Sequence, residues 1–211
     1  MSDVTLFDFW RSSASYRCRI ALNLAGIEYT SVPVDLPTKQ HKTREHFARN
    51  PQGFVPVLDI DGLRLTQSLA ILEYLDTTRD LGLLPKDPAA RARMQAVAHS
   101  IAVDIHPVCN LQVAAYAVEI TGREEVRAEW MRRFIRPGMQ AFEELLGAYE
   151  QTPFACGNAP TLVDVCLMPQ VYNARRWGAE LSDLPRTMAA VAACEAHPAF
   201  AAAHPDEWQP A

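Results

Sequence analysis

The chain has 211 residues, of which 49% are apolar and 21% are charged, the proportions of an ordinary globular protein and not of a disordered chain. Its formal net charge of -5, without a concentrated basic face, argues against a nucleic acid as partner. The five cysteines form no CxxC pair, so we expect reduced, mostly buried thiols and no bound metal.

The N-terminal sequence lacks the basic and apolar regions of a signal peptide, and no run of about 18 consecutive apolar residues occurs in the chain. We therefore expect a cytoplasmic protein that has no membrane partner.

Strand and helix patterns alternate over the first part of the chain. The segments with strand patterns are 4–9, 28–34, 57–60 and 63–66. The segments with helical patterns are 13–25, 38–49 and 67–78. Asp61-Gly62, between the last two strands, is a pair typical of tight hairpin turns. This order, with a proline at the start of the third strand, predicts a thioredoxin-like domain over residues 1–80.

A proline-containing linker over residues 81–87 separates this domain from a segment without strand patterns. The sequence predicts an all-helical domain over residues 88–211, and hence an α/β domain plus an all-α domain. The predicted helices are 89–118, 124–149, 161–177 and 184–197, with kinks at Pro107 and Pro137 and an irregular tail after Pro198. Thr161 and Asp164 form a capping box, which we interpret as a folding element.

Arg11-Ser12-Ser13-Ala14-Ser15 lies where the first strand ends and the first helix begins. Hydroxyls and backbone N–H groups at a helix start suit an anion, and they can lower the pKa of a bound thiol from about 8.5 to between about 3.5 and 7.5. None of the chain's cysteines lies here, so the thiol would come from a ligand. The alternative is that these serines are ordinary helix caps.

Two further segments can each be interpreted as a ligand-binding site or as an ordinary structural element. Val55-Pro56 opens the third strand, where a cis peptide and an extended peptide ligand can be accommodated. Gln67 and Ser68, at the start of the third helix, offer an amide, a hydroxyl and backbone donors to a carboxylate. The alternative is an ordinary turn and an ordinary helix cap.

Several longer motifs carry a specific resemblance. They are FWRSSASYRCRIALNLAGIEY, NPQGFVPVLDIDG, QSLAILEYLD, LLPKDPAARAR, DIHPVCN and GNAPTLVDVCLMPQVYNARRW. Over essentially its full length the chain resembles the zeta class of the cytosolic glutathione transferases, the class of the maleylacetoacetate and maleylpyruvate isomerases.

The resemblance implies glutathione as the cofactor and assigns residues to it. Ser12 would donate a hydrogen bond to the glutathione thiolate, assisted by Ser13. The remaining residues expected to contact glutathione are Gln40 or His41 at the glycyl end, Val55 and a cis Pro56 at the cysteinyl backbone, Gln67 and Ser68 at the γ-glutamyl end, and Asn110.

The substrate of such an isomerase is a keto acid with two carboxylates, for which arginine is the natural ligand. The resemblance implies that Arg11, His106 and Arg176 bind it and stabilise developing charge, while Arg175 is expected to be a solvated surface residue. The expected reaction is a cis–trans isomerisation of maleylacetoacetate or maleylpyruvate by reversible thiolate addition to the double bond. The resemblance also implies a homodimer and a place in aromatic acid catabolism.

Two positions depart from the zeta pattern. Ala14 stands where a cysteine is common, which disfavours a reductive dehalogenation that needs that cysteine. Gln112 stands where related bacterial sequences often have arginine, which leaves the choice of diacid open. A general glutathione transferase or haloacid-dehalogenating activity, and a non-catalytic binding module on the same scaffold, remain alternatives.

Overall fold

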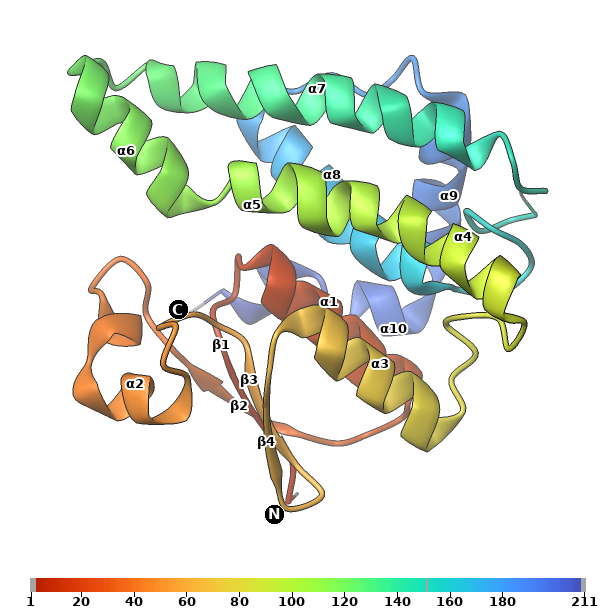
Figure 1. Ribbon diagram of the computed structural model, residues 1–211, viewed down its shortest axis with the longest axis horizontal. Helices are drawn as coiled ribbons and strands as arrows, with labels where there is room; N and C mark the ends of the chain where they lie inside the picture. The colour runs from red at the N-terminus through yellow and green to blue at the C-terminus, as the bar shows by residue number, and fades with distance from the viewer. Residues whose placement is uncertain (1–2, 151, 210–211) are drawn as a thin grey trace. The chain divides into compact units, whose positions relative to one another are not determined.

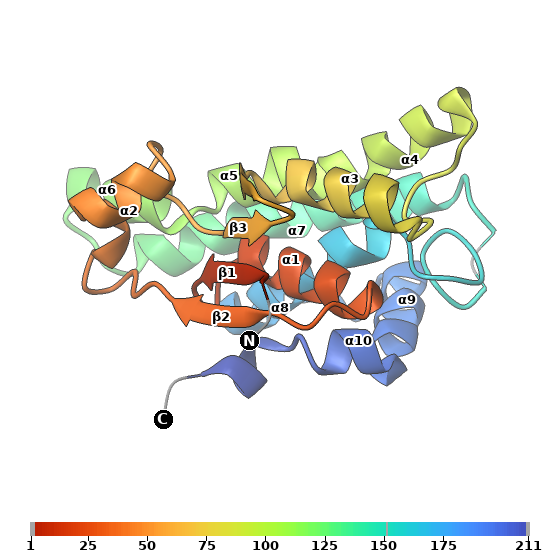
Figure 2. The ribbon, with the colours of Figure 1, turned by 90° about the horizontal axis from the view of Figure 1, so that it is seen from below.

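The structure is a computed structural model that describes residues 3–150 and 152–209. The chain forms two compact units (Figures 1 and 2). The first consists of the chain up to Gly82 together with the segment that begins at His197, and the second is Leu83–Ala196.

The first unit is built on a mixed four-stranded sheet of order β2-β1-β3-β4. Its strands are β1 (Thr5–Asp8), β2 (Thr30–Pro33), β3 (Val57–Ile60) and β4 (Leu63–Thr66). Strand β1 pairs in parallel with β2 and antiparallel with β3, and β3 pairs antiparallel with β4. This is the mixed sheet of a thioredoxin-like domain, as the sequence predicts.

Three helices cover the two faces of this sheet. They are α1 (Ser13–Leu24), α2 (Arg44–Arg49) and α3 (Ser68–Arg79). Helices α1 and α3 pack together on one face, and α2 lies on the other (Figures 1 and 2). The predicted helix over 38–49 is shorter than expected, because a 3₁₀ turn, Gln40–Lys42, and Thr43 precede α2.

Alternation along the strands supplies the two cores of the unit. Leu6 and Leu58, which are register partners, are fully buried on one face. Phe7 and Val57 are the next register pair, and with Val34 they form a separate buried cluster on the other face. The guanidinium of Arg49 from α2 lies 4.4 Å from the centre of the Phe7 ring. Both faces of β1 are therefore covered.

Local signals in the sequence are confirmed at two turns. Asp61 and Gly62 have φ values of 52° and 75°, as the tight hairpin turn between β3 and β4 requires. The Val55-Pro56 peptide bond is cis, as expected. A second cis peptide, Thr152-Pro153, lies in the helical unit and was not predicted.

The C-terminal segment differs from the expectation of an irregular tail. It contains α10 (Pro198–Ala201) and a 3₁₀ helix (Pro205–Trp208), each with a proline in its first turn, where the missing N–H is harmless. The segment belongs to the first unit, although its sequence position suggested the helical domain. The Trp208 and Tyr29 rings stack with centroids 5.7 Å apart, and Asn23 donates to the Ala199 carbonyl at 3.0 Å.

The second unit consists of packed helices (Figure 1). They are α4 (Pro88–His99), α5 (His106–Val108), α6 (Leu111–Thr121), α7 (Val126–Leu146), α8 (Leu162–Trp177) and α9 (Pro185–Ala196). Helix α8 packs against α4, α7 and α9 and is the most buried of them. The predicted capping box at its start is present.

The predicted helix over 89–118 is interrupted near Pro107. A π-helical segment, Ser100–Ile105, follows α4 and leads into the short α5. A proline cannot donate to the carbonyl four residues earlier and its ring crowds that carbonyl, which explains an irregular turn here. The Val108 carbonyl accepts a hydrogen bond of 3.0 Å from the Trp130 indole. Pro137, in contrast, lies inside α7, which continues through it.

By length and composition alone, the helical stretch Pro88–Thr121 would be able to cross a membrane. Core helices of globular proteins pass the same test, and this stretch packs against α7 and α8. All five cysteines are free thiols and four are buried, as expected. Within residues 3–150 and 152–209, no group of three metal-ligating side chains occurs.

Candidate active site

Ser12 caps the start of α1 and retains its own hydroxyl proton. Its extended backbone, with φ -68° and ψ 121°, ends the turn after β1. The Ser12 hydroxyl oxygen accepts from the Ser15 N–H at 3.2 Å, so its proton is available to donate elsewhere. Helix geometry leaves the N–H groups of Ser13 and Ala14 without an intrahelical acceptor. The helix start therefore offers three donors to an anion.

Arg11 lies beside this helix start and is held by aromatic rings. Its guanidinium carbon lies 4.8 Å from the centre of the Trp10 ring and 5.8 Å from that of Phe9. Within the described part of the chain, its buried Nε has no hydrogen-bond partner. Stacking of this kind orients a guanidinium while leaving its in-plane donors available for a carboxylate.

The chain's own thiols are poorly suited to act as nucleophiles. Burial raises the pKa of Cys18 to about 12, of Cys109 to about 11 and of Cys156 to about 12. The pKa of Cys194 is also raised, first by burial and then by the nearby Asp164 carboxylate. Because the thiolate is the reactive form, a raised pKa disfavours these four thiols as nucleophiles at neutral pH.

The segment before β3 is anchored through its carbonyls. The Phe54 carbonyl accepts from His46 Nε2 at 2.9 Å and from Asn50 Nδ2 at 3.0 Å. The Gly53 carbonyl accepts from Lys42 Nζ at 3.3 Å. Val55 lies between this anchored segment and β3, outside the strand pairing, so its backbone is placed to pair with an extended peptide.

Gln67 and Ser68 form an uncapped start of α3. Gln67 has a φ of 66° and makes no side-chain cap hydrogen bond. Its amide instead donates to the Gln52 carbonyl oxygen at 2.8 Å. The Ser68 hydroxyl oxygen accepts from Arg17 Nη1 at 3.3 Å. An uncapped helix start with a hydroxyl is a suitable site for a carboxylate.

The two residues expected at the glycyl end of glutathione, Gln40 and His41, differ in their hydrogen-bond partners. The Gln40 side-chain oxygen, Oε1, accepts from the Asp35 N–H at 2.7 Å, which gives Gln40 a role in holding its own turn. His41 has a buried Nδ1 without a partner in the described chain. Its pKa is lowered by burial first, then by the Lys42 charge. His41 is thus the better candidate of the two.

Lys42 and Gln52 are two polar residues that contact the candidate site segments and were not predicted from the sequence. Lys42 follows His41 directly, and its ammonium lies 5.1 Å from the centre of the Phe54 ring. The cation next to two polar candidates was the available signal. Gln52 contacts Gln67 across 15 residues of sequence, a contact that no local sequence pattern indicates.

The helical unit holds the remaining predicted residues. Asn110 is the cap of α6, and its side-chain Oδ1 accepts from the Gln112 N–H at 3.1 Å, so the Asn110 side chain has a structural role. His106 begins α5, directly after the π-helical segment.

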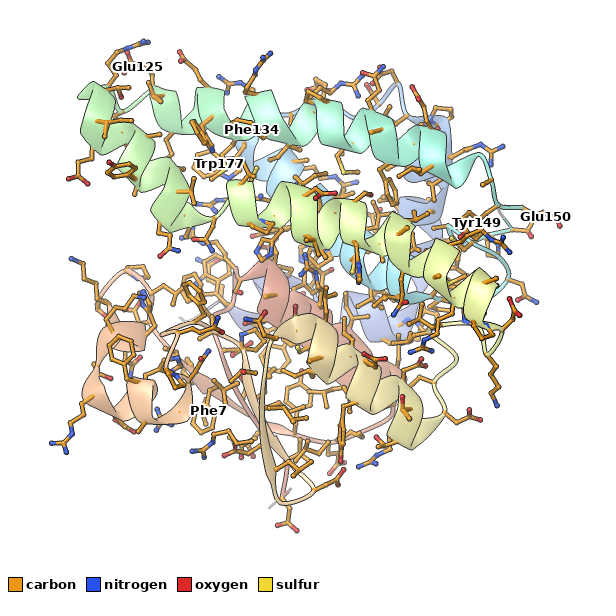
Figure 3. All side chains as sticks on the ribbon, viewed as in Figure 1. Phe7, Glu125, Phe134, Tyr149, Glu150 and Trp177 are labelled. Carbon is orange, nitrogen blue, oxygen red and sulfur yellow. The ribbon has the colours of Figure 1, made fainter. Side chains whose placement is uncertain are left out.

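The two arginines near the end of α8 differ. The guanidinium of Arg176 lies 4.7 Å from the centre of the Trp177 ring, which Figure 3 labels at the end of α8. Arg175 Nη1 instead pairs with Glu195 at 2.6 Å, and both side chains are about half exposed, at 52% and 47%. Arg175 is thus a surface residue, as expected.

Comparisons with known proteins identify the family of this chain. Residues 2–77 match the family "Glutathione S-transferase, N-terminal domain". The chain is 54% identical over 211 residues to the maleylacetoacetate isomerase of Rhizobium meliloti (strain 1021), covering 99% of each chain.

Two solved structures are also similar over nearly the whole chain. One is the holo structure of a maleylpyruvate isomerase, a bacterial zeta-class glutathione S-transferase, with 38% identity, 98% of each chain covered and a TM-score of 0.93. The other is a maleylacetoacetate isomerase of Methylobacterium extorquens AM1 with bound malonate and glutathione, with 38% identity, 98% of each chain covered and a TM-score of 0.91. The chain therefore belongs to the glutathione transferase family and, within it, to the zeta class of maleylacetoacetate and maleylpyruvate isomerases.

Proposed function

We propose that this protein is a glutathione-dependent cis–trans isomerase of a maleyl keto diacid, maleylacetoacetate or maleylpyruvate. The observation that carries the proposal is the start of α1, where the Ser12 hydroxyl accepts from the Ser15 N–H and keeps its proton for an external anion. Full-length similarity to isomerases of both substrates supports it.

The residues of the first unit fit glutathione. Two helix starts, at Ser12 and at Ser68, offer donors to anions. Val55 lies between them in the sequence, and its backbone is placed to pair with the backbone of an extended peptide. His41 and Lys42 add a polar and a cationic group for the glycyl carboxylate. Bound glutathione would supply a sulfur nucleophile that adds reversibly to the substrate double bond.

Ser12 stabilises the thiolate by donating a hydrogen bond to it, and the N–H groups of Ser13 and Ala14 add the positive end of the α1 dipole. Arg11, oriented by Trp10, binds a substrate carboxylate. Arg176 and His106 of the helical unit bind the second carboxylate and stabilise the negative charge that develops during the reaction. The first unit thus acts as the glutathione-binding domain and the helical unit as the substrate-binding domain.

The proposal also includes a homodimer in the cytoplasm, on the strength of the family. Light scattering combined with size exclusion would test the first part, and fractionation of the source cells the second. A monomer at working concentration, or a membrane-bound pool, would contradict them.

The test of function is a spectrophotometric assay of both maleyl diacids. We expect turnover with glutathione and none with S-methylglutathione, which binds without offering a thiol. Chlorodinitrobenzene and dichloroacetate, assayed beside them, report transferase and dehalogenase activity. Turnover of only chlorodinitrobenzene or dichloroacetate would indicate a transferase or a dehalogenase instead of an isomerase. Turnover of no substrate would favour a non-catalytic binding module.

A further inference from the structure

Within residues 3–150 and 152–209, Arg17 is a buried cation without a carboxylate partner. It lies on α1 and is 2% exposed. Its Nη1 donates to the Ser68 hydroxyl oxygen at 3.3 Å. Its Nε and Nη2 are buried and bonded to no residue in the described part of the chain. A guanidinium removed from water without a counter-ion is costly, so such a group suits an anionic ligand.

Arg19, two residues further along the same helix, shows how this fold satisfies a structural arginine. It is fully buried, and its Nη1 pairs with Asp8 at 2.6 Å. Its Nε donates to the Ala203 carbonyl at 3.1 Å and its Nη2 to the Trp10 carbonyl at 2.8 Å. Burial alone therefore does not explain the open donors of Arg17.

The single partner of Arg17 belongs to the uncapped start of α3. Because the Ser68 oxygen accepts from Arg17, the Ser68 proton must point away from Arg17, toward another acceptor. The 12-residue helix adds the positive end of its dipole, and Gln67 provides no cap. A hydroxyl donor, open N–H groups and a buried guanidinium thus converge on one helix start.

We propose that Arg17 is a positioning residue for glutathione. It fixes the Ser68 hydroxyl as a donor to the α-carboxylate of the γ-glutamyl residue. This role rests on the proposed function, which provides the tripeptide as the anionic ligand. Arg17 acts through Ser68 and takes no part in the chemistry at the sulfur.

Calorimetric titration of the full chain with two ligands tests the role. One ligand is glutathione, and the other is γ-aminobutyryl-cysteinylglycine, which lacks only the α-carboxylate. We expect Arg17→Gln to weaken glutathione binding about tenfold or more, since hydrogen bonds to charged groups contribute on this scale. The same substitution should leave the Kd of the analogue unchanged, and Arg17→Lys should lie between.

A double-mutant cycle isolates the route through Ser68. If Arg17 acts through that hydroxyl, Arg17→Gln with Ser68→Ala should weaken glutathione little more than Ser68→Ala alone. Arg64→Gln is the matched control, because it removes an arginine of the same unit from an exposed pair with Asp59. It should leave both Kd values unchanged.

Three results would overturn the role of Arg17: an unchanged glutathione Kd, an equal loss for both ligands, or additive effects in the cycle. If Arg17→Gln does not fold, as thermal denaturation would reveal, Arg17→Lys and Ser68→Ala carry the same comparison between ligands. A wild-type chain that binds neither ligand would overturn the proposed function itself. A wild type that binds glutathione while Arg17→Gln binds it equally well overturns only this inference.

Discussion

Helix α8 of the helical unit and helix α3 of the first unit begin in opposite ways. At the start of α8, Asp164 is fully buried and accepts from the Thr161 N–H at 2.8 Å, the Thr161 hydroxyl at 2.8 Å and the Ala155 N–H at 2.9 Å. At the start of α3, Gln67 makes no cap hydrogen bond and has a φ of 66°. One start is closed by the protein and the other is open.

This difference distinguishes helix starts that stabilise the fold from helix starts that can bind a ligand. A closed start satisfies its donors internally, so changing it should affect stability. An open start keeps its donors for a ligand, so changing it should affect binding. The start of α1 has both properties, because Ser12 caps one N–H and still has a proton to donate.

The largest effect is expected at the closed start. Asp164→Ala leaves two N–H groups and a hydroxyl buried without an acceptor, and should lower the free energy of unfolding by about 3 kcal/mol or more. Denaturant unfolding monitored by circular dichroism measures it. The matched control is Asp87→Ala, which removes an exposed cap that accepts from the Ala90 N–H at 2.7 Å and should cost about 1 kcal/mol. Equal losses for the two variants would show that burial of the Asp164 cap adds nothing to its effect on stability.

The closed start also shows why much of the fold was predictable. The capping box at Thr161 and Asp164, the Asp61-Gly62 turn and the strand alternation are local patterns whose physical cause lies within a few residues. The position of the C-terminal segment does not follow from a local sequence pattern. The segment joins the first unit because Arg19 and Tyr29, far away in sequence, bind Ala203 and Trp208.

The same limit applies to the candidate site. Ser12 and Ser68 were predictable because each begins a helix after a strand. The difference between Arg17 and Arg19 was not, since each arginine has apolar neighbours in the sequence and its side-chain partner lies elsewhere in the chain, Ser68 for Arg17 and Asp8 for Arg19. Sequence periodicity places both on α1 and says nothing about their hydrogen bonds.

The mixed start of α1 should respond in activity more than in stability. Ser12→Ala should lower the rate at neutral pH about tenfold or more, because the pKa of the bound thiol rises toward its ordinary value of about 8.5. Part of the rate should return as the pH is raised. A pH–rate profile measures this shift, and Asp87→Ala, a cap of the same kind on α4, should leave the profile in place. An unmoved profile in Ser12→Ala would remove Ser12 from the mechanism.

Arg176 and Arg175 provide a smaller and more selective test on the helical unit. Arg176→Ala should raise the KM for a maleyl diacid by about tenfold, the usual scale for one charge-assisted hydrogen bond, while the Kd of glutathione stays constant. Arg175→Ala breaks only the exposed pair with Glu195 and should change neither. Steady-state kinetics and calorimetry measure the two quantities. If Arg176→Ala impairs a neutral electrophile such as chlorodinitrobenzene equally, its role is structural.

The smallest effect is expected at His41, which does not belong to either of the compared helix starts. The effect is a change of ligand affinity with pH. Because its pKa is lowered, mainly by burial, His41 is neutral at pH 7 and gains its proton only in more acidic solution. A carboxylate bound beside the ring would favour the protonated form, so binding should take up a proton and tighten as the pH falls. S-methylglutathione, whose sulfur does not titrate, should bind about threefold more tightly at pH 5.5 than at pH 8. Calorimetry in buffers of different ionisation enthalpy counts the proton directly. His41→Gln should abolish both the uptake and the pH dependence, and if it does not, the glycyl carboxylate is held by another group.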